Sequence, residues 1–315
     1  MRAAAIQLEA VVGDVDANLA ACERLGDEAG AAGAELIALP EFFSTGIGFV
    51  PALAEAALPP GGAATELMRG LALRHGALVG GSFICRDADG EVRNAYIVIR
   101  PDGGVAGRHD KDLPTMWENS FYVGGHDDGV IEVGDDLTAG AAVCWELMRT
   151  QTVRRLRGRV DLVMSGSGWW SLSRSWGPPA LIEPLETRNE RRAQRAAETF
   201  AAYVGAPVVH AAHAGELECE TPWFPLSYRG HFEGATVICA ADGTVLAARD
   251  RREGEGVVAA EIEPGRRPPS AQPPPGFWLH PRGAVAAAAW HLHRAHGRRW
   301  YRRHVSRAAA RPHTP

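Results

Sequence analysis

The chain has 315 residues, a formal net charge of −5, and 46% hydrophobic and 23% charged residues. Its length allows one large α/β domain or two ordinary domains. No apolar run approaches the roughly 18 to 20 residues that cross a bilayer. Glu9 and Asp14 fall where the apolar part of an export signal would be. We therefore expect a cytoplasmic protein outside the membrane, and the negative charge gives no reason to expect nucleic-acid binding.

The cysteines indicate unpaired thiols. Five is an odd number, they are widely spaced, and the sequence contains no C-x-x-C. This pattern fits neither a disulfide framework nor a zinc site.

The basic residues are unusual because all 33 are arginine except Lys111. Such a bias is typical of codon composition, and one lysine can survive it by chance. An ammonium group, however, is a compact charge on a flexible stem, which a planar guanidinium does not replace. Lys111 is therefore a candidate functional residue.

The apolar periodicity predicts strands that alternate with helices, with hairpins between some of them. In chain order we expect a strand at 3–11, a helix and a strand in each of 18–41 and 64–86, a hairpin at 94–113, two strands at 129–146, a helix and a strand in each of 150–168 and 186–215, and a hairpin and a strand at 234–264. The hairpins favour a layered α/β domain with mixed sheets over a purely parallel one. No nucleotide-binding glycine motif is present.

The composition changes after residue 264, where the stretch "GRRPPSAQPPPG" cannot continue a helix or a central strand. We place one domain at 1–265 and a proline-rich linker with a basic C-terminal extension at 266–315. The extension has the spacing of a basic amphipathic helix. Its histidines lack a metal-binding pattern, so we expect a solvated helix or an arm that contacts another subunit.

Three reactive side chains each follow an apolar, strand-like run. Glu41 lies in "LIALPEFFSTG", Lys111 in "GRHDKDLPTMWENSFYVGG" and Cys144 in "TAGAAVCWELMR". Loops at strand ends are common places for functional residues on a rigid scaffold. Taken alone, Cys144 is better explained as a buried core thiol than as a nucleophile.

The order of these residues, with "LPE", "K-x-L-P" and "C-W-E", resembles the nitrilase or carbon–nitrogen hydrolase superfamily. The resemblance covers most of residues 1–263. It implies a four-layer αββα sandwich with mixed sheets, and subunits that pair as a homodimer or a higher homo-oligomer. It also implies a cysteine hydrolase that acts on a small molecule and needs no metal and no cofactor.

The resemblance assigns a chemical role to each residue. A neutral thiol needs a neighbouring base or cation to become nucleophilic. Glu41 would be that base for Cys144, and Lys111 would stabilise the oxyanion together with the backbone N–H of Trp145. Because Lys111 must reach both a carboxylate and a reacting oxygen, arginine should fail in its place.

A second glutamate follows the lysine in this family, and Glu118 in "MWENSF" is the best match. It would position the lysine or the attacking water. Asp110, Asp112 and Glu146 are neighbouring carboxylates that compete for this role. Asp110 is also a departure, because the family often has arginine before the lysine.

Aromatic residues around these motifs suggest an aromatic-lined pocket, although each can equally be an ordinary core residue. Residues 171–186 and 213–232 would line or cover the pocket. The aromatic candidates are Trp117, Tyr122, Trp145, Trp169 and Trp170.

Three functions remain open from the sequence. The first is hydrolysis of a non-peptide C–N bond in a small amide or carbamoyl compound, through a thioester, with release of ammonia or an amine. The second is hydrolysis of a nitrile to an acid and ammonia. The third is a non-catalytic scaffold that binds an anionic partner through its basic tail, against which the mutually consistent glutamate, lysine and cysteine argue.

Overall fold

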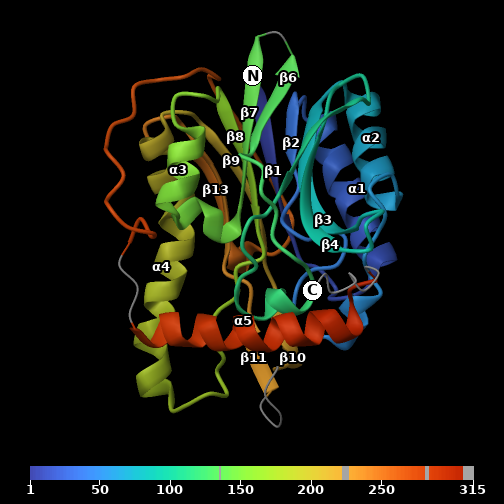
Figure 1. Cartoon of the computed structure of the whole chain (residues 1–315). Helices are drawn as coiled ribbons and strands as arrows, with labels where there is room; N and C mark the ends of the chain where they lie inside the picture. Colours follow the sequence, from blue (N-terminus) through green and yellow to red (C-terminus); the bar gives the residue numbers. More distant parts are fainter. Residues whose placement is uncertain (135, 222–226, 281–283, 308–315) are drawn as a thin grey trace, which may run out of the picture.

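A mixed β-sheet runs through the centre of the computed structural model (Figure 1). The structure describes residues 1–134, 136–221, 227–280 and 284–307. The strands follow the order β5-β4-β3-β2-β1-β9-β8-β7-β6; in addition, β14 pairs with β1, and β12 pairs with β9 and β13. Their bounds are β1 (Arg2–Leu8), β2 (Leu36–Ala38), β3 (Leu78–Arg86), β4 (Val92–Ile99), β5 (Val105–Asp110), β6 (Val130–Gly134), β7 (Leu137–Val143), β8 (Leu162–Ser167), β9 (Val208–His213), β12 (Gly234–Cys239), β13 (Val245–Asp250) and β14 (Gly256–Glu261).

The strand directions confirm the predicted mixed α/β class. Strands β1, β2 and β3 are parallel to one another, and so are β7, β8 and β9. The segment predicted as a hairpin at 94–113 forms the antiparallel pair β4–β5. Because β3, β4 and β5 alternate in direction, β5 runs the same way as β2 and β7. These strands therefore end at the same edge of the sheet.

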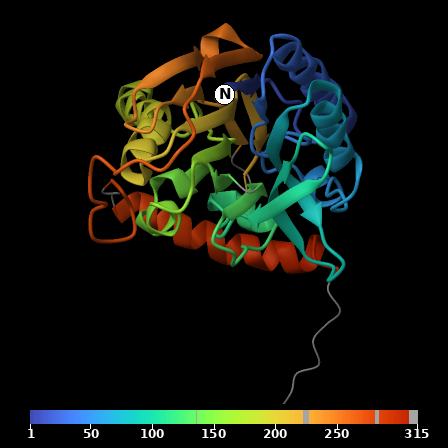
Figure 2. The same ribbon diagram turned by 90° about the horizontal axis from the view of Figure 1, so that it is seen from above.

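Two halves of the sheet face each other and form the inner layers of the molecule. A Cβ added to Gly80 of β3 would lie 2.6 Å from the Met164 side chain of β8, and one added to Gly107 of β5 would lie 2.8 Å from Ile131 of β6. Helices α1 and α2 cover one outer face and α3 and α4 cover the other (Figures 1 and 2). This is the αββα layering that the resemblance implied.

The helices begin and end at residues suited to those positions. The Asp14 side chain accepts a hydrogen bond from Ala17 N at the start of α1, as N-cap residues do. Helix α4 ends at Gly205, whose φ of 79° favours glycine. The helices are α1 (Val15–Ala31), α2 (Ala63–His75), α3 (Thr150–Leu156), α4 (Pro179–Val204) and α5 (Ala284–His304), and the 3₁₀ turns are η1 (Pro51–Ala54), η2 (Met116–Ser120), η3 (Cys144–Met148) and η4 (Arg251–Glu253).

The segment 213–232, which we expected to be a pocket loop, contains a separate hairpin. Its strands β10 (Glu216–Glu220) and β11 (Ser227–His231) pair antiparallel, and residues 222–226 lie outside the described part. The alternation in "ELECE" is the strand signal that this interpretation passed over.

The C-terminal segment packs back onto the chain. Leu279 N donates to Met148 O at 2.8 Å, so the backbone after the proline-rich stretch joins η3. Helix α5 crosses the end of the sandwich beside η2 (Figures 1 and 2). It is fixed there by Tyr301, whose hydroxyl accepts a 2.8 Å hydrogen bond from Val92 N. One face of the expected basic helix is therefore buried against the domain.

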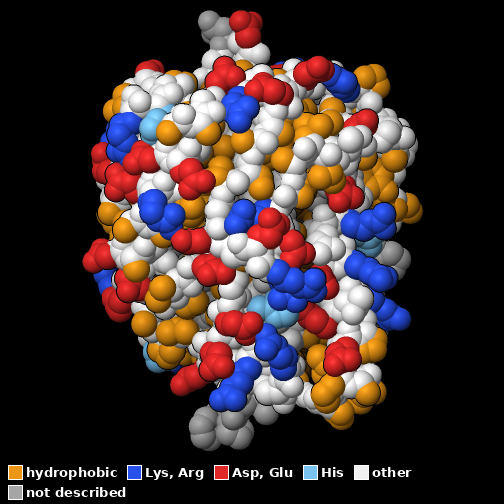
Figure 3. Space-filling view, turned by 180° about the vertical axis from the view of Figure 1, so that it is seen from behind, with side chains coloured by type: hydrophobic (Ala, Val, Ile, Leu, Met, Phe, Trp, Pro, Cys, Tyr) orange, Lys and Arg blue, Asp and Glu red, His pale blue; other side chains and the backbone are white. Residues whose placement is uncertain are grey.

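The surface carries charges of both signs. Acidic and basic side chains are intermixed on the face opposite to the view of Figure 1 (Figure 3). Among the described helices, none combines the length and apolarity that a membrane span requires.

Gly297 tests how closely α5 must approach η2. A Cβ at this position would lie 2.6 Å from Asn119 Cβ and 2.8 Å from Asn119 C. Gly297→Ala should therefore lower the free energy of unfolding by about 1 to 3 kcal/mol, although alanine favours a helix by about 1 kcal/mol. Chemical denaturation measures the loss, and hydrogen exchange should rise in α5.

Gly70→Ala in α2 is the matched control, because its new Cβ meets only the flexible end of Arg74, at 3.1 Å. This variant should be unchanged or more stable. If both variants were unchanged or more stable than the unmodified chain, the close packing of α5 against η2 would be contradicted.

Candidate active site

The three predicted residues meet at the edge where β2, β5 and β7 end. Glu41 follows β2, Lys111 directly follows β5, and Cys144 directly follows β7. All three are buried. The carboxyl ends of neighbouring strands commonly form the binding site of an open α/β sheet.

Glu41 is held in one orientation by three donors. Its Oε1 accepts from Lys111 Nζ at 2.8 Å and from Asn94 Nδ2 at 2.8 Å. Its Oε2 accepts from the backbone N–H of Gly168 at 2.8 Å. Sequence reasoning missed Asn94, although an amide inside the apolar strand "NAYIVI" is a signal for a buried polar contact.

Lys111 lies between two buried carboxylates. Its Nζ donates to Glu118 Oε2 at 2.7 Å, in addition to Glu41. Glu118 Oε2 also accepts from Thr115 N at 2.9 Å and from the hydroxyl of Tyr122. The Glu118 carboxylate thus contacts the Lys111 ammonium directly.

The competing carboxylates lie elsewhere. Asp110 pairs with Arg108 at 2.7 Å, and Asp112 pairs with Arg149. Asp110, the residue that departs from the family pattern, is therefore neutralised by an ion pair with Arg108 of the same strand. Glu146, the third competing carboxylate, is bound to His109 at 2.8 Å.

Cys144 occupies a strained position beside these groups. Its φ is 53°, which is uncommon for a residue with a side chain and typical of functional sites. Burial raises the pKa of its thiol well above the usual value, and the nearby Glu41 carboxylate, which accepts its hydrogen bond, raises it further; Lys111 opposes both. The thiol is thus neutral at rest.

One of the two carboxylate oxygens of Glu118 accepts no hydrogen bond from the described residues. Among the described residues, no hydrogen-bond partner meets Glu118 Oε1. Burial raises the pKa of Glu118 to about 7; Lys111 lowers it and Glu41 raises it. A buried acceptor without a donor is costly, so Oε1 is suited to accept from a group that enters the site.

Glu146 links the lysine segment to the cysteine segment. Its Oε2 accepts from Val143 N at 2.8 Å, one residue before Cys144. Its Oε1 accepts from Asp112 N at 3.1 Å, one residue after Lys111. His109, buried between Glu146 and Asp127, completes the connection at 2.8 Å from Glu146 Oε2. The sequence analysis considered Glu146 only as an alternative to Glu118 and did not identify His109.

Four of the aromatic candidates form two stacked or packed pairs, and the fifth, Tyr122, contacts the cluster. Trp117 stacks on Trp170 with ring centroids 4.4 Å apart. Trp169 packs against Trp145 at 6.3 Å. Tyr122 contacts Glu118 and therefore belongs to the charged cluster rather than to a pocket wall alone.

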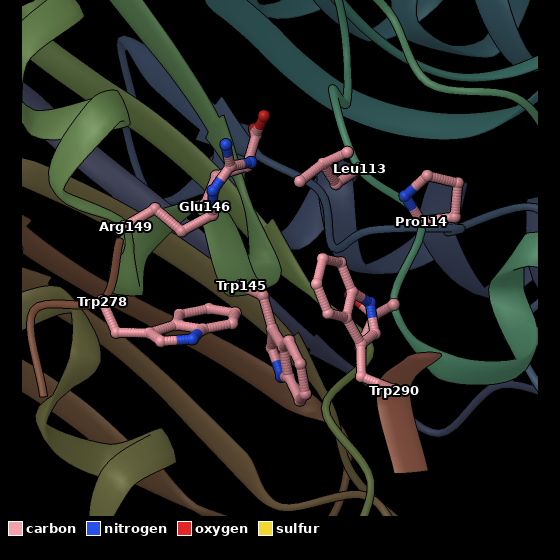
Figure 4. A pocket seen from close by; sticks show the side chains of 8 residues that line it. Leu113, Pro114, Trp145, Glu146, Arg149, Trp278 and Trp290 are labelled. Atoms are coloured by element: carbon pink, nitrogen blue, oxygen red, sulfur yellow. The ribbon is translucent and has the colours of Figure 1, made fainter. Parts of the chain in front are cut away.

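A small pocket lies at Trp145, the residue that follows Cys144, although Cys144 itself does not line it. Its volume is about 10 Å³, which is close to the least that holds one water. Figure 4 shows Trp278 and Trp290 on either side of Trp145. Trp278 lies 5.6 Å from Trp145 between ring centroids, and the remaining wall is Leu113, Pro114, Thr115, Glu146 and Arg149.

Of the two segments expected to line or cover the pocket, residues 171–186 lie mostly at the surface, whereas most described residues of 213–232 are buried and Tyr228 packs against Trp117 at 5.3 Å between ring centroids. Residues 179–186 form the exposed start of α4, and Arg174 pairs with Glu216 in solvent. The segment after residue 275 instead contributes Trp278 and Trp290 to the wall. Sequence analysis did not predict this, because a tail's composition does not say which surface it contacts.

A family model described as carbon-nitrogen hydrolase matches residues 2–269. The chain belongs to this family. The membership confirms the resemblance that the three motifs carried. Trp278 and Trp290 of the pocket wall lie beyond the matched residues.

Solved structures of other carbon-nitrogen hydrolases share the fold. A mutant amidase from Nesterenkonia sp. AN1, with acrylamide added at its active-site cysteine, is 20% identical over 83% of this chain and 92% of that chain, with a TM-score of 0.61. A superfamily protein from Xanthomonas campestris, with an arsenic adduct in its active site, is 18% identical over 83% and 90%, with a TM-score of 0.64. A nitrilase superfamily member from Saccharomyces cerevisiae is 18% identical over 84% and 90%, with a TM-score of 0.64. No curated protein matches the sequence significantly.

Lys111→Met tests the charge balance of the cluster. Without the ammonium, two carboxylates remain buried close together, so the free energy of unfolding should fall by about 3 to 5 kcal/mol near neutral pH. Glu118 has a pKa of about 7 in the unmodified chain, and Lys111 lowers it, so the substitution should raise this pKa further. Below about pH 7 the carboxyl is protonated in both folded proteins, so the deficit relative to the unmodified chain should grow as the pH rises above about 7, as measured by urea denaturation.

Arg93→Met is a control, because Arg93 pairs with Asp87 and Asp89 near the surface. The substitution should lower the free energy of unfolding by about 1 kcal/mol or less, and this change should be nearly independent of pH. A deficit in Lys111→Met that stays constant with pH would contradict the charge-balance explanation.

Proposed function

We propose that this carbon-nitrogen hydrolase cleaves the C–N bond of a small amide or carbamoyl compound through a thioester on Cys144. The observation that carries the proposal is the buried ammonium of Lys111, which lies 2.8 Å from Glu41 and 2.7 Å from Glu118 beside a neutral thiol. A base, a cation and a nucleophile at one strand edge are the parts that acyl transfer requires.

In the first half of the reaction, Glu41 takes the proton of the Cys144 thiol as sulfur attacks the carbonyl carbon. The carbonyl oxygen becomes an oxyanion. Glu41 then gives the proton to the leaving nitrogen, the C–N bond breaks, and ammonia or an amine departs. The remaining acyl group is bound to sulfur as a thioester.

In the second half, water attacks the thioester carbonyl and Glu41 takes a proton from it. The proton returns to sulfur as the C–S bond breaks, and the acid is released. The donors of Asn94 and Gly168 keep both oxygens of Glu41 in place through both halves. A fixed base of this kind needs no reorganisation during proton transfer.

Lys111 and Trp145 support the oxyanion. The ammonium carries three donors, and two of them bind Glu41 and Glu118, so the third is available for the oxyanion. The backbone N–H of Trp145 directly follows the nucleophile and supplies the second contact. Glu118 holds Lys111 through Oε2, and its unpartnered Oε1 accepts from the substrate nitrogen or from the attacking water.

The pocket favours a substrate with a short, apolar acyl group. This pocket at Trp145 has a volume of about 10 Å³ and three tryptophans in its wall, so it leaves little room next to the residue that follows Cys144. The side that limits this room belongs to the C-terminal segment, which must shift for a larger substrate to bind.

Ammonia release tests the proposed reaction. A panel of short-chain amides, carbamoyl compounds and nitriles of matched length should give most product with the amides or carbamoyl compounds. Cys144→Ala should lower the rate about a thousandfold or more, because it removes the nucleophile. Cys219→Ala is the control, since this thiol lies outside the cluster, and it should keep the rate.

Other outcomes separate the alternatives. Faster turnover of nitriles than of the matched amides would identify a nitrilase. Failure of every compound, together with no preferential alkylation of Cys144, would contradict catalysis and favour a scaffold.

Trp290→Ala tests the contribution of α5 to substrate size. Removal of the indole should raise kcat/KM for amides with longer acyl groups at least about tenfold relative to the shortest one, which corresponds to about 1.4 kcal/mol. Leu292→Ala is the control, because this side chain is 57% exposed on the same helix. An equal size preference in both variants would show that Trp290 does not limit the substrate.

A further inference from the structure

Three side chains outside the active site direct ligand atoms to one point. They are Glu186 of α4, His231 at the end of β11, and Glu233 just before β12. One ligand atom from each lies within 4.8 Å of the other two. His231 Nε2 is 3.4 Å from Glu186 Oε1 and 3.7 Å from Glu233 Oε2. These separations are longer than protein hydrogen bonds.

The converging atoms are buried and unsatisfied. Glu186 Oε1, His231 Nε2 and Glu233 Oε2 have no hydrogen-bond partner among the residues that the structure describes. The Glu233 side chain is 0% exposed and that of His231 is 10% exposed. His231 Nε2 forms only long ion pairs with the two carboxylates. Since most buried polar atoms find a closer partner, the three atoms are arranged to accept a common ligand.

The other carboxylate oxygens are fixed by donors from the protein. Glu186 Oε2 accepts from Leu172 N at 2.7 Å. Glu233 Oε1 accepts from Asn189 Nδ2. These contacts orient the free oxygens toward His231, as outer partners orient the ligands of a metal ion.

We propose that Glu186, His231 and Glu233 bind one divalent transition-metal ion, such as Zn²⁺ or Mn²⁺. An imidazole with two carboxylates is a common ligand set for such ions. A tetrahedral ion with bonds of about 2.1 Å separates its ligands by about 3.4 Å, close to the two distances found. The two carboxylates balance the charge of a dication, and the partly exposed Glu186 leaves a route from solvent.

Two arginines limit the affinity. Arg174 Nη2 lies 3.4 Å from His231 Nδ1 and also pairs with Glu216 at 2.7 Å. When Nε2 binds an ion, Nδ1 carries the ring proton, so Arg174 remains with Glu216. Arg251 is close enough to act electrostatically on His231. Both cations weaken the binding of a dication.

The ion would stabilise the structure and would take no part in the hydrolysis. It would connect α4 to the hairpin β10–β11 and to the start of β12. Glu233 N donates to Trp169 O at 2.8 Å, and the preceding Gly168 N donates to Glu41. The bound ion therefore supports the loop that orients Glu41.

Metal titration of the chelator-treated full chain tests the site. Isothermal calorimetry with Mn²⁺ and with Zn²⁺ should show one equivalent bound, and the melting temperature should rise with the ion. Glu186→Gln and Glu233→Gln should lower the affinity at least tenfold and remove the rise. Glu183→Gln, an exposed residue on the same helix, should behave as the unmodified chain.

Circular dichroism before metal addition establishes that each variant is folded, and the partly exposed Glu186 makes Glu186→Gln the milder change. The same titration in Cys144→Ala detects an ion on the active-site thiol. No binding by the unmodified chain would overturn the proposal. So would equal binding by folded Glu186→Gln, or a loss confined to Cys144→Ala.

Discussion

The buried ion triad of Lys111 with Glu41 and Glu118 is the interaction on which the rest of the site depends. Taking three charges out of water is costly unless each is paired and hydrogen-bonded. Here Lys111 Nζ reaches both carboxylates, and Asn94, Gly168, Thr115 and Tyr122 supply further donors. The triad thereby fixes a base and a cation beside the Cys144 thiol, and the net negative charge keeps that thiol protonated until a substrate arrives.

The scaffold explains how residues far apart in sequence meet with this accuracy. Strands β2, β5 and β7 end at one edge, and each is followed by a member of the site. Glu146 then ties the segment after Lys111 to the segment before Cys144 through two backbone N–H groups. Removing either connection would loosen the distance between the cation and the nucleophile, on which the stabilisation of an oxyanion depends.

The sequence predicted correctly those parts of the fold and the site that are encoded by short, local patterns of residues. Strand periodicity predicted where Glu41, Lys111 and Cys144 lie, and the order of their motifs predicted the family. Asn94 and His109 were missed because their partners are distant in sequence and are chosen by packing. The contact of the C-terminal segment with the pocket was missed for the same reason: the spacing of the extension predicts an amphipathic helix but not the surface that the helix contacts. Trp278 and Trp290 consequently add the C-terminal segment to the wall of the small pocket at Trp145, which neither 171–186 nor 213–232 lines.

The central claim is that Cys144 carries the acyl group during turnover. Acid quenching of the unmodified enzyme with its best amide, followed by mass spectrometry of the peptide that contains Cys144, tests this directly. We expect a peptide whose mass is increased by the acyl group, and hydroxylamine should restore the free thiol. Continued release of ammonia with an unmodified Cys144 peptide at every time point would contradict the account.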